Sequence, residues 1–417
     1  MQALGNPALV VWARVHDVFD GLPGSPPWIN SHGEVAYTIS RDYSDASAPR
    51  LDLVTSDTAT TLRRLLRRLK HSNDIHDHRA FSVCRPGYGW DTTLARRRLI
   101  YPHDSVHEFE LSLLQAHAGV VTTDASGRDD SDINQYLDLW NDAFLNSCDV
   151  VAVFPATEGR MRDYCAHGIT QQYPNRICDR DSKPEEDKRA DEEAQLPTAQ
   201  SLRSDQQACE TVDARPLAGP AQLIDHDTWW QELAGFRVLV VHPFARTIEA
   251  QYAKHHALLA HNASGGGLFP GNPNALPKFA ELLTMKPPVG GSSDATRGAR
   301  WQIHLEIAQQ QLSNLAPHFD VALVAAGAWG PLLQRFLKQD LRKSSIYVGG
   351  ALQLHFGIWG GRYIDLAEVR AVASMEHWTW PQDDETATLK AELKGEYESY
   401  ATPDNASHKE SEISNSN

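Results

Sequence analysis

The chain has 417 residues, of which 41% are hydrophobic and 8% aromatic, and its formal net charge is −15. This length and composition predict one large or two medium folded units and exclude a small domain held together by disulfides. No window approaches about eighteen uninterrupted apolar residues, and the first residues lack the pattern of a signal peptide. We therefore expect a soluble, cytoplasmic protein without a transmembrane segment.

The acidity is concentrated in two segments. Residues 181–213 contain ten acids and four bases, and residues 382–417 contain nine acids and three bases, so −12 of the −15 lies there. Both segments are poor in aliphatic residues, which predicts solvated and disordered chain. The balance argues against duplex nucleic acid as a partner, and a scaffold that recruits partners through these segments remains one alternative.

The cysteines show no pattern that predicts a bridge or a metal site. They are odd in number, scattered, and never spaced as CxxC. Such usage predicts ordinary thiols and neither a disulfide framework nor a structural zinc site. The five are Cys84, Cys148, Cys165, Cys178 and Cys209.

The chain divides into two patterned halves separated by the first acidic segment. We expect an N-terminal extension over 1–50 and the first half of an α/β domain over 51–171. An acidic disordered insertion follows over 172–222, then the second half of the domain over 223–400 and a disordered tail over 401–417. The basic run "TTLRRLLRRLK" at 60–70 predicts a helix that covers the core with its leucines and exposes its arginines. A membrane or acidic-partner surface is the alternative reading of this run.

Short apolar runs, each followed by a polar or glycine-containing turn and a helix-period segment, recur five times. They are "AFSVC" at 80–84, "CDVVAVF" at 148–154, "FRVLVV" at 236–241, "FDVALVAA" at 319–326 and "SSIYV" at 344–348. Continuous apolar strands are typical of a parallel sheet covered on both faces. The sequence therefore predicts an α/β fold with a Rossmann-like, doubly wound, mainly parallel sheet.

Open parallel sheets bind ligands outside the carboxyl ends of their strands, so the loops after these strands form the candidate site. Backbone N–H groups, glycines and guanidinium groups in such loops suit an anionic ligand. The candidate binding residues are Arg85, Gly87, Gly89, Trp90, Arg246, Thr247, Gly327, Gly349 and Gly350.

Several of these features have a structural alternative. Gly349 and Gly350 fit a tight turn as well as a phosphate cradle, and Gly360 with Gly361 fits a helix ending. His242 fits a general base as well as a histidine satisfied by its own loop. The chain has neither a GxGxxG fingerprint nor a P-loop, which argues against a nicotinamide dehydrogenase or a nucleotide hydrolase.

Four long motifs resemble the GT-D type of glycosyltransferase from bacteria. They are "FRVLVVHPFARTIEAQY", "FDVALVAAGAWGPLL", "VGGALQLHFGIWGGRY" and "MEHWTWP", in this order and with similar spacing. The resemblance covers roughly 75–170 and 225–400. It implies a Rossmann-like fold and transfer of a sugar from a nucleotide-sugar donor to a glycan acceptor, with Mn²⁺ or Mg²⁺ holding the diphosphate. It also draws Gln353 and Arg362 into the candidate binding site.

The chain departs from these relatives at the acidic pair. Their R-F-G-D-G-E motif aligns with "RPGYGW", which has Tyr88 and Trp90 at the two acidic positions. The charge that would hold a divalent metal is therefore missing there, and the metal ligands stay unassigned. The candidate catalytic residues are His242, His377 and Asp91.

The sequence thus predicts a glycosyltransferase that acts in glycan or polysaccharide biosynthesis. The alternative is a catalytically impaired protein that keeps the site for binding a nucleotide or a glycan.

Overall fold

The structure is a computed structural model of the whole chain. It describes residues 27–29, 35–38, 55–71, 80–85, 90–100, 130–153, 210–213, 228–261, 267–270, 274–288, 300–360 and 366–386. It also describes the single residues 103, 106, 110, 111, 114, 120, 217, 223, 272 and 363.

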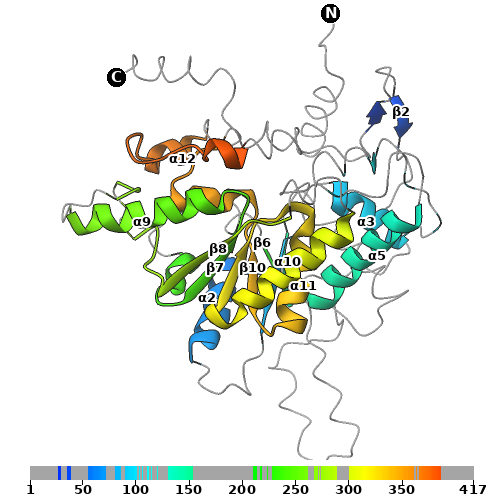
Figure 1. Cartoon of the computed structure of the whole chain (residues 1–417), viewed down its shortest axis with the longest axis horizontal. Coiled ribbons are helices and arrows are strands. Elements are labelled where there is room, and N and C mark those ends of the chain that lie inside the picture. Colours follow the sequence, from blue (N-terminus) through cyan, green and yellow to red (C-terminus); the bar gives the residue numbers. More distant parts are fainter. Residues whose placement is uncertain are drawn as a thin grey trace, which may run out of the picture.

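An eight-stranded sheet forms the centre of the molecule, in the order β3-β6-β5-β4-β10-β9-β7-β8, and every neighbouring pair is parallel (Figure 1). The strands are β3 (Thr55–Ser56), β4 (Ser82–Cys84), β5 (Val150–Val153), β6 (Glu210–Asp213), β7 (Arg237–Val241), β8 (Glu281–Met285), β9 (Val321–Val324) and β10 (Ser344–Tyr347). A separate antiparallel pair joins β1 (Pro27–Ile29) to β2 (Val35–Thr38), within the expected N-terminal extension. The predicted α/β fold with a mainly parallel sheet is confirmed.

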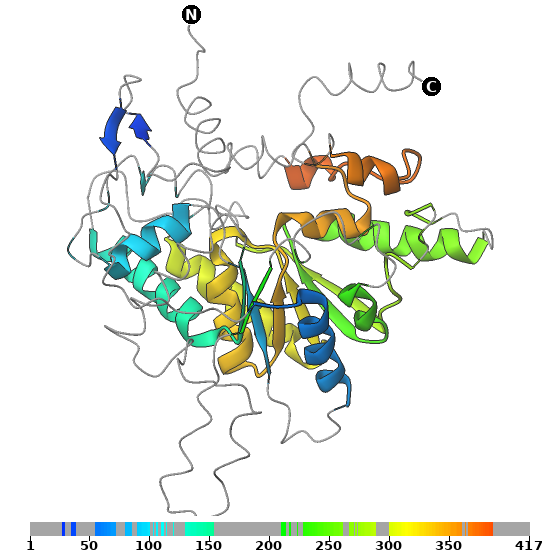
Figure 2. The same cartoon turned by 180° about the vertical axis from the view of Figure 1, so that it is seen from behind.

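Helices cover both faces of the sheet. One layer contains α3 (Trp90–Ile100), α5 (Asp130–Ser147), α10 (Trp301–Leu315) and α11 (Gly330–Arg335), and Figure 1 shows α5, α10 and α11 in front of the sheet. The other layer contains α2 (Thr58–His71), the 3-10 helix η4 (Trp229–Leu233), α9 (Ala245–His261), the 3-10 helix η8 (Gly350–Phe356) and α12 (Ala367–Val372). Figure 2 shows α2 on this second side. Short segments η5 (Ala316–His318), η6 (Gly327–Trp329) and the π-helix η7 (Phe336–Asp340) connect these elements.

The alternation of side chains along each strand explains the two layers. In β7, Leu239 and Val241 pack toward the α10 layer, whereas Val238 and Val240 pack toward the α9 layer. Because successive side chains of a strand point to opposite faces, a strand that is apolar throughout must be covered on both sides. The continuous apolar runs in the sequence therefore specify two helical layers.

Two neighbouring central strands send the chain to opposite layers. After β4 the chain continues into α3 in the α10 layer, and after the adjacent β10 it continues into η8 in the α9 layer. Divergent connections between adjacent strands mark the place where open α/β sheets bind ligands. This position lies at the carboxyl ends of β4 and β10.

The basic helix has the predicted orientation. In α2, Leu62, Leu65 and Leu66 are buried in the core, while Arg64 and Arg67 are exposed. No helix among the described residues is long and apolar enough to cross a membrane.

Three expectations need correction. Strand β6, Glu210–Asp213, pairs with β5 inside the segment 172–222 for which we expected no regular structure. Glu385, expected in a solvated segment, is 3% exposed. Cys84 and Cys148, expected as separate thiols, form a disulfide. Pairing of β4 with β5 brings these two cysteines together, and no spacing rule in the sequence reports such a pairing.

Candidate functional site

Arg85 lies at the carboxyl end of β4, against the carboxyl end of β10. Its guanidinium carbon is 5.3 Å from the centre of the Tyr347 ring, within the range of a cation–π interaction. A Cβ atom built on Gly349 would lie 1.7 Å from Arg85 Nη2. The guanidinium therefore occupies the space that any side chain at position 349 would need.

Gly349 is required here for a second reason. Its φ is +77°, in the region that side-chain-bearing residues rarely adopt. Its N–H donates to the Val324 carbonyl at 3.1 Å, so this N–H links the end of β10 to the end of β9. Gly349 thus acts by making room for Arg85, whereas the sequence predicted a contact between its N–H and phosphate.

Two tyrosine hydroxyls hold the turn after β9. Tyr347 Oη donates to the Gly327 carbonyl at 3.1 Å, and Tyr136 Oη donates to the Ala328 carbonyl at 3.1 Å. Gly327 itself is exposed and has a φ of +51°. On the other side of Tyr347, a Cβ atom on Gly330 would lie 2.0 Å from the ring. The ring is therefore enclosed between two glycines and Arg85.

Asp91 adds a negative charge to this group from the first turn of α3. It is 9% exposed. Burial raises the pKa of Tyr136 well above its usual value, and the charge of Asp91 raises that pKa further. We call the set Arg85, Asp91, Tyr136, Gly327, Tyr347 and Gly349 the β4–β10 cluster.

His242 lies at the carboxyl end of β7 and is 1% exposed. Its Nδ1 accepts a hydrogen bond from the Phe244 N–H at 3.0 Å, so in the neutral ring the proton resides on Nε2. Burial lowers the pKa of His242 to about 3. Nε2 has no hydrogen-bond partner among the described residues. His242 is therefore a neutral, interior donor whose ring packs against Phe244.

The first turn of α9 is already occupied by a carboxylate. Glu385 accepts hydrogen bonds from the Arg246 N–H at 2.8 Å, from the Thr247 N–H at 3.3 Å and from the Thr247 hydroxyl. The Arg246 guanidinium pairs with Asp384. We call this arrangement the α9 cap. We predicted that Arg246 and Thr247 bind a ligand at the start of α9. In the structure the carboxylate of Glu385 occupies this position.

Gln353 is fully buried in η8. Its Nε2 donates to the Trp359 carbonyl at 2.8 Å, and a Cβ on Gly360 would lie 2.4 Å from that nitrogen. Helix η8 ends at Gly357, whose φ is +65°, so Gly360 does not form the expected helix ending. Gln353 holds the following turn in place inside the protein.

The remaining predicted residues lie elsewhere or are not described. Gly350 begins η8 and is partly exposed. His377 lies against α9, where its carbonyl accepts hydrogen bonds from Gln251 at 3.0 Å and from Lys254 at 2.9 Å. Three candidates, Gly87, Gly89 and Arg362, and the side chain of Trp90 lie outside the described residues.

The described residues do not fit a divalent metal. They contain no group of three His, Cys, Asp or Glu side chains that could hold one. Asp91 is the one carboxylate that we place in the β4–β10 cluster, whereas Mg²⁺ and Mn²⁺ sites usually collect several oxygen ligands. We therefore derive no step through a metal.

Four residues of these two sites were not predicted from the sequence: Tyr136, Tyr347, Asp384 and Glu385. Tyr347 stands directly before the glycine pair, and an aromatic residue at a strand end was a usable signal. Tyr136 lies within a helix and Glu385 lies 138 residues from Thr247. Neither has a local pattern that distinguishes it from a core or a surface residue.

Comparisons of the chain with models of protein families, with curated proteins and with solved structures find no match.

Proposed function

We propose that the chain binds a nucleotide-sugar donor at the β4–β10 cluster and transfers the sugar to a glycan acceptor. The observation that supports this most directly is the guanidinium of Arg85, held over Tyr347 and Gly349 between strands whose connections diverge. A positive charge at this edge suits a diphosphate. The motif resemblance to GT-D glycosyltransferases supports the sugar-transfer step.

In this proposal Arg85 stabilises the charge that develops on the leaving diphosphate. The Tyr347 ring holds the guanidinium by a cation–π contact, so less side-chain entropy is lost on binding. Asp91 is the candidate base, because it lies in the first turn of α3, the helix that follows β4 and Arg85. It would take the proton of the acceptor hydroxyl as the bond to the sugar forms.

His242 is a weaker candidate for the base. A pKa of about 3 keeps it neutral at physiological pH, but 1% exposure leaves it out of contact with an acceptor. His377 contacts the α9 region instead.

A non-catalytic binding protein is the second candidate. Two observations favour it: the Gly349 N–H is used within the protein, and Tyr88 and Trp90 replace the acids of the GT-D motif. Such a protein would retain Arg85 for binding and would lack turnover.

The test combines binding with product release. We expect UDP- or GDP-sugars to raise the melting temperature of the wild-type chain, and Arg85→Ala to weaken binding by about tenfold to a hundredfold. Arg246→Ala is the matched control, because its guanidinium already pairs with Asp384 and should leave the affinity unchanged. Release of nucleoside diphosphate in the presence of a glycan acceptor would establish transfer. Binding without release supports the second candidate, and absence of binding by every nucleotide-sugar refutes both.

A further inference from the structure

The disulfide between Cys84 and Cys148 lies directly beside the β4–β10 cluster. Cys84 ends β4 and is followed in the chain by Arg85, while Cys148 lies in the turn between α5 and β5. Both residues belong to the core on the α10 side of the sheet. The covalent bond therefore restrains Cys84, the residue that directly precedes Arg85.

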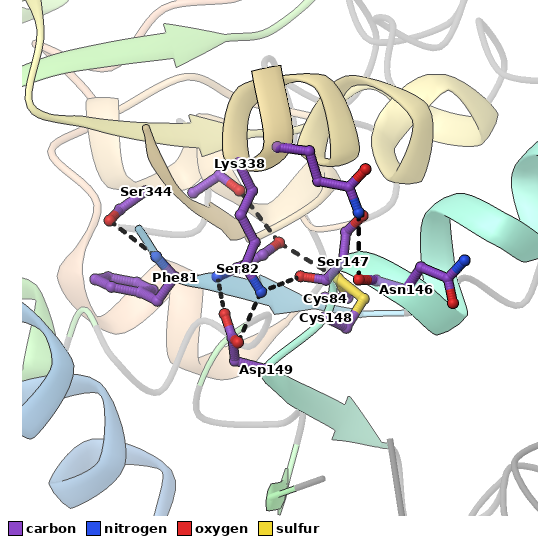
Figure 3. A network of polar contacts seen from close by, with 11 residues as sticks. Phe81, Ser82, Cys84, Asn146, Ser147, Cys148, Asp149, Lys338 and Ser344 are labelled. Atoms are coloured by element: carbon purple, nitrogen blue, oxygen red, sulfur yellow. Dashed lines mark hydrogen bonds and ion pairs between the residues drawn. A yellow bond between two sulfur atoms is a disulfide. The ribbon is translucent and has the colours of Figure 1, made fainter. Parts of the chain in front are cut away.

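A polar network holds the two cysteines together independently of the bond (Figure 3). Lys338, in η7, donates to the Ser147 carbonyl at 2.8 Å and to Asp149 Oδ1 at 2.7 Å. The other oxygen of Asp149 accepts from the Ser82 N–H at 2.8 Å. The Asp149 N–H donates to the Ser82 carbonyl at 2.9 Å. These contacts tie the Cys148 turn to β4 whether or not the sulfur atoms are joined.

Two further contacts hold this turn and the strand. Gln339 Nε2 lies 3.2 Å from Ser147 Oγ, and Gln334 Nε2 donates to the Val83 carbonyl at 2.9 Å. Parallel pairing of Cys84 with Val151 adds the sheet ladder. Reduction therefore removes one covalent link from a frame that has several other links.

The two cysteines differ in burial. Cys148 is 8% exposed as a whole residue and Cys84 is 1% exposed, so we assign Cys148 as the residue that an outside thiolate attacks. The Ser82 hydroxyl lies 3.5 Å from the Cys84 sulfur. It can donate a hydrogen bond to the Cys84 thiolate that forms when the bond breaks.

We propose that Cys84 and Cys148 are a reversible redox pair that controls the position of Arg85. In the reductive step one thiolate of a dithiol attacks Cys148, the sulfur–sulfur bond breaks, and its electron pair leaves on Cys84, which takes up a proton. The second thiol of the dithiol then closes onto the first and releases Cys148. The protein disulfide gains two electrons and two protons, and the dithiol becomes a cyclic disulfide.

The consequence for binding rests on the proposed function. With the bond closed, Arg85 is held over Tyr347 and Gly349. With the bond open, hydrogen bonds still hold Ser82 and Val83, but Cys84 loses its covalent restraint, so Arg85 gains freedom and the affinity for an anionic ligand falls.

The first experiment maps the pair and the motion of β4 without any ligand. Peptide mapping of the unreduced chain should recover Cys84 linked to Cys148, and dithiothreitol should convert both to alkylatable thiols. Hydrogen exchange of a peptide covering 80–85 should then accelerate by about tenfold more than exchange in β7, which reports the loss of global stability alone. The melting temperature should fall by about 5 to 10 °C, because a closed loop with a sequence separation of 64 residues is released.

Variants distinguish a reversible redox pair from a disulfide that only stabilises the fold. Cys148→Ser should reproduce the exchange of the reduced protein, and Cys209→Ser, outside the described residues, should not. Lys338→Met should slow re-formation of the bond by oxidised dithiothreitol several-fold, since it releases the Cys148 turn. Lys343→Met is the matched control, because Lys343 donates to the Phe319 carbonyl, away from this turn. If Lys338→Met fails to fold, Gln339→Ala tests the same turn.

Three outcomes would overturn the proposal: no linked peptide in the oxidised chain, unchanged exchange of 80–85 on reduction, or equal acceleration of exchange in β7, which would mean global unfolding.

Measuring nucleotide-sugar affinity in both redox states completes the test, and a lower affinity in the reduced state is expected. If neither state binds, the proposed function fails, while the exchange of 80–85 still decides on the redox pair.

Discussion

The carboxyl ends of β7 and β10 belong to the same edge of one sheet, yet they have different electrostatic surroundings. At β7 the first turn of α9 donates its N–H groups to Glu385, so an internal carboxylate satisfies the helix start. At β10 the guanidinium of Arg85 packs on Gly349 and lies over the Tyr347 ring. Topology makes both places suitable for an anion. Residues 382–386 fill the first, and the second holds the guanidinium of Arg85 within the β4–β10 cluster.

This difference separates the predicted residues by role. Arg246 and Thr247 support the attachment of residues 382–386, whereas Arg85 and Gly349 belong to the candidate binding site. Changes at the α9 cap should therefore alter stability, and changes at the β4–β10 cluster should alter binding as well.

The largest expected effect is acid destabilisation through the buried histidines that follow the two strands, His242 after β7 and His355 in η8. Burial lowers the pKa of each to about 3, from 6.5 in the unfolded chain. Between these values the unfolded state binds a proton that the folded state does not, so stability falls as the pH drops below 6.5. At pH 4.5 each histidine should cost about 2.7 kcal/mol of unfolding free energy.

Urea unfolding at pH 7 and at pH 4.5 measures this loss. His242→Asn keeps an acceptor for the Phe244 N–H, and His355→Phe keeps a ring against Trp230, whose centre lies 4.1 Å away. Each single variant should lose less unfolding free energy between pH 7 and pH 4.5 than the wild type does, and the double variant should lose the least. A loss that is identical in all four proteins would contradict the assignment.

A smaller loss is expected when Gly330 is replaced by alanine. The new Cβ would lie 2.0 Å from the Tyr347 ring, so the ring must move and Arg85 with it. Overpacking of this kind should destabilise the chain by about 2 kcal/mol, even though alanine favours a helix more than glycine does.

The double-mutant cycle with Tyr347→Leu isolates this contact in urea unfolding. In the Tyr347→Leu protein, Gly330→Ala should be neutral or stabilising. Equal costs in both proteins would show that the ring does not limit position 330.

Removing the carboxylate of the α9 cap should have a similar or slightly smaller effect. Glu385→Ala leaves two backbone N–H groups and the Thr247 hydroxyl without their acceptor, which should cost about 2 kcal/mol. Glu376→Ala serves as control, because its side chain is 85% exposed and its loss should change thermal stability little. Nucleotide-sugar affinity should stay the same in both variants, and a clear change on loss of Glu385 would mean that the two strand ends are coupled.

The smallest effect is expected for the neighbouring ion pair. Asp384 and Arg246 have side chains that are 57% and 58% exposed. Asp384→Asn should therefore change the unfolding free energy by less than about 0.5 kcal/mol at moderate salt. A loss as large as that of Glu385→Ala would show that the pair, rather than the carboxylate on the backbone, holds the segment.

The central part of the fold could be predicted because a continuous apolar run indicates a strand that is buried on both faces of a sheet. All five predicted strands are present as β4, β5, β7, β9 and β10. Strand β8 was not predicted, because it lies at the edge of the sheet and its side chains are only partly buried. Strand β6 was missed because "ETVD" is polar and lies in acidic surroundings. Its pairing with β3 and β5 is a property of the tertiary structure alone.

The candidate site could be predicted in part. Strand-end positions correctly selected Arg85 and Gly349 as neighbours, because parallel strands end at a common edge. The hydrogen-bond acceptor of each backbone N–H could not be predicted in the same way. Whether Gly349 donates to Val324 or Thr247 donates to Glu385 depends on partners far away in the chain.

The packing of Tyr347 also has an evolutionary consequence. Its ring fills the space above Gly330, and the Arg85 guanidinium lies above Gly349, so a side chain at 330 requires the ring to move and a side chain at 349 requires the guanidinium to move. In homologous chains a smaller residue at 347 should accompany a side chain at 330, whereas glycine at 349 should persist even where the guanidinium at 85 is lost, because its φ is +77°. The four positions together would then identify the chains that share this site.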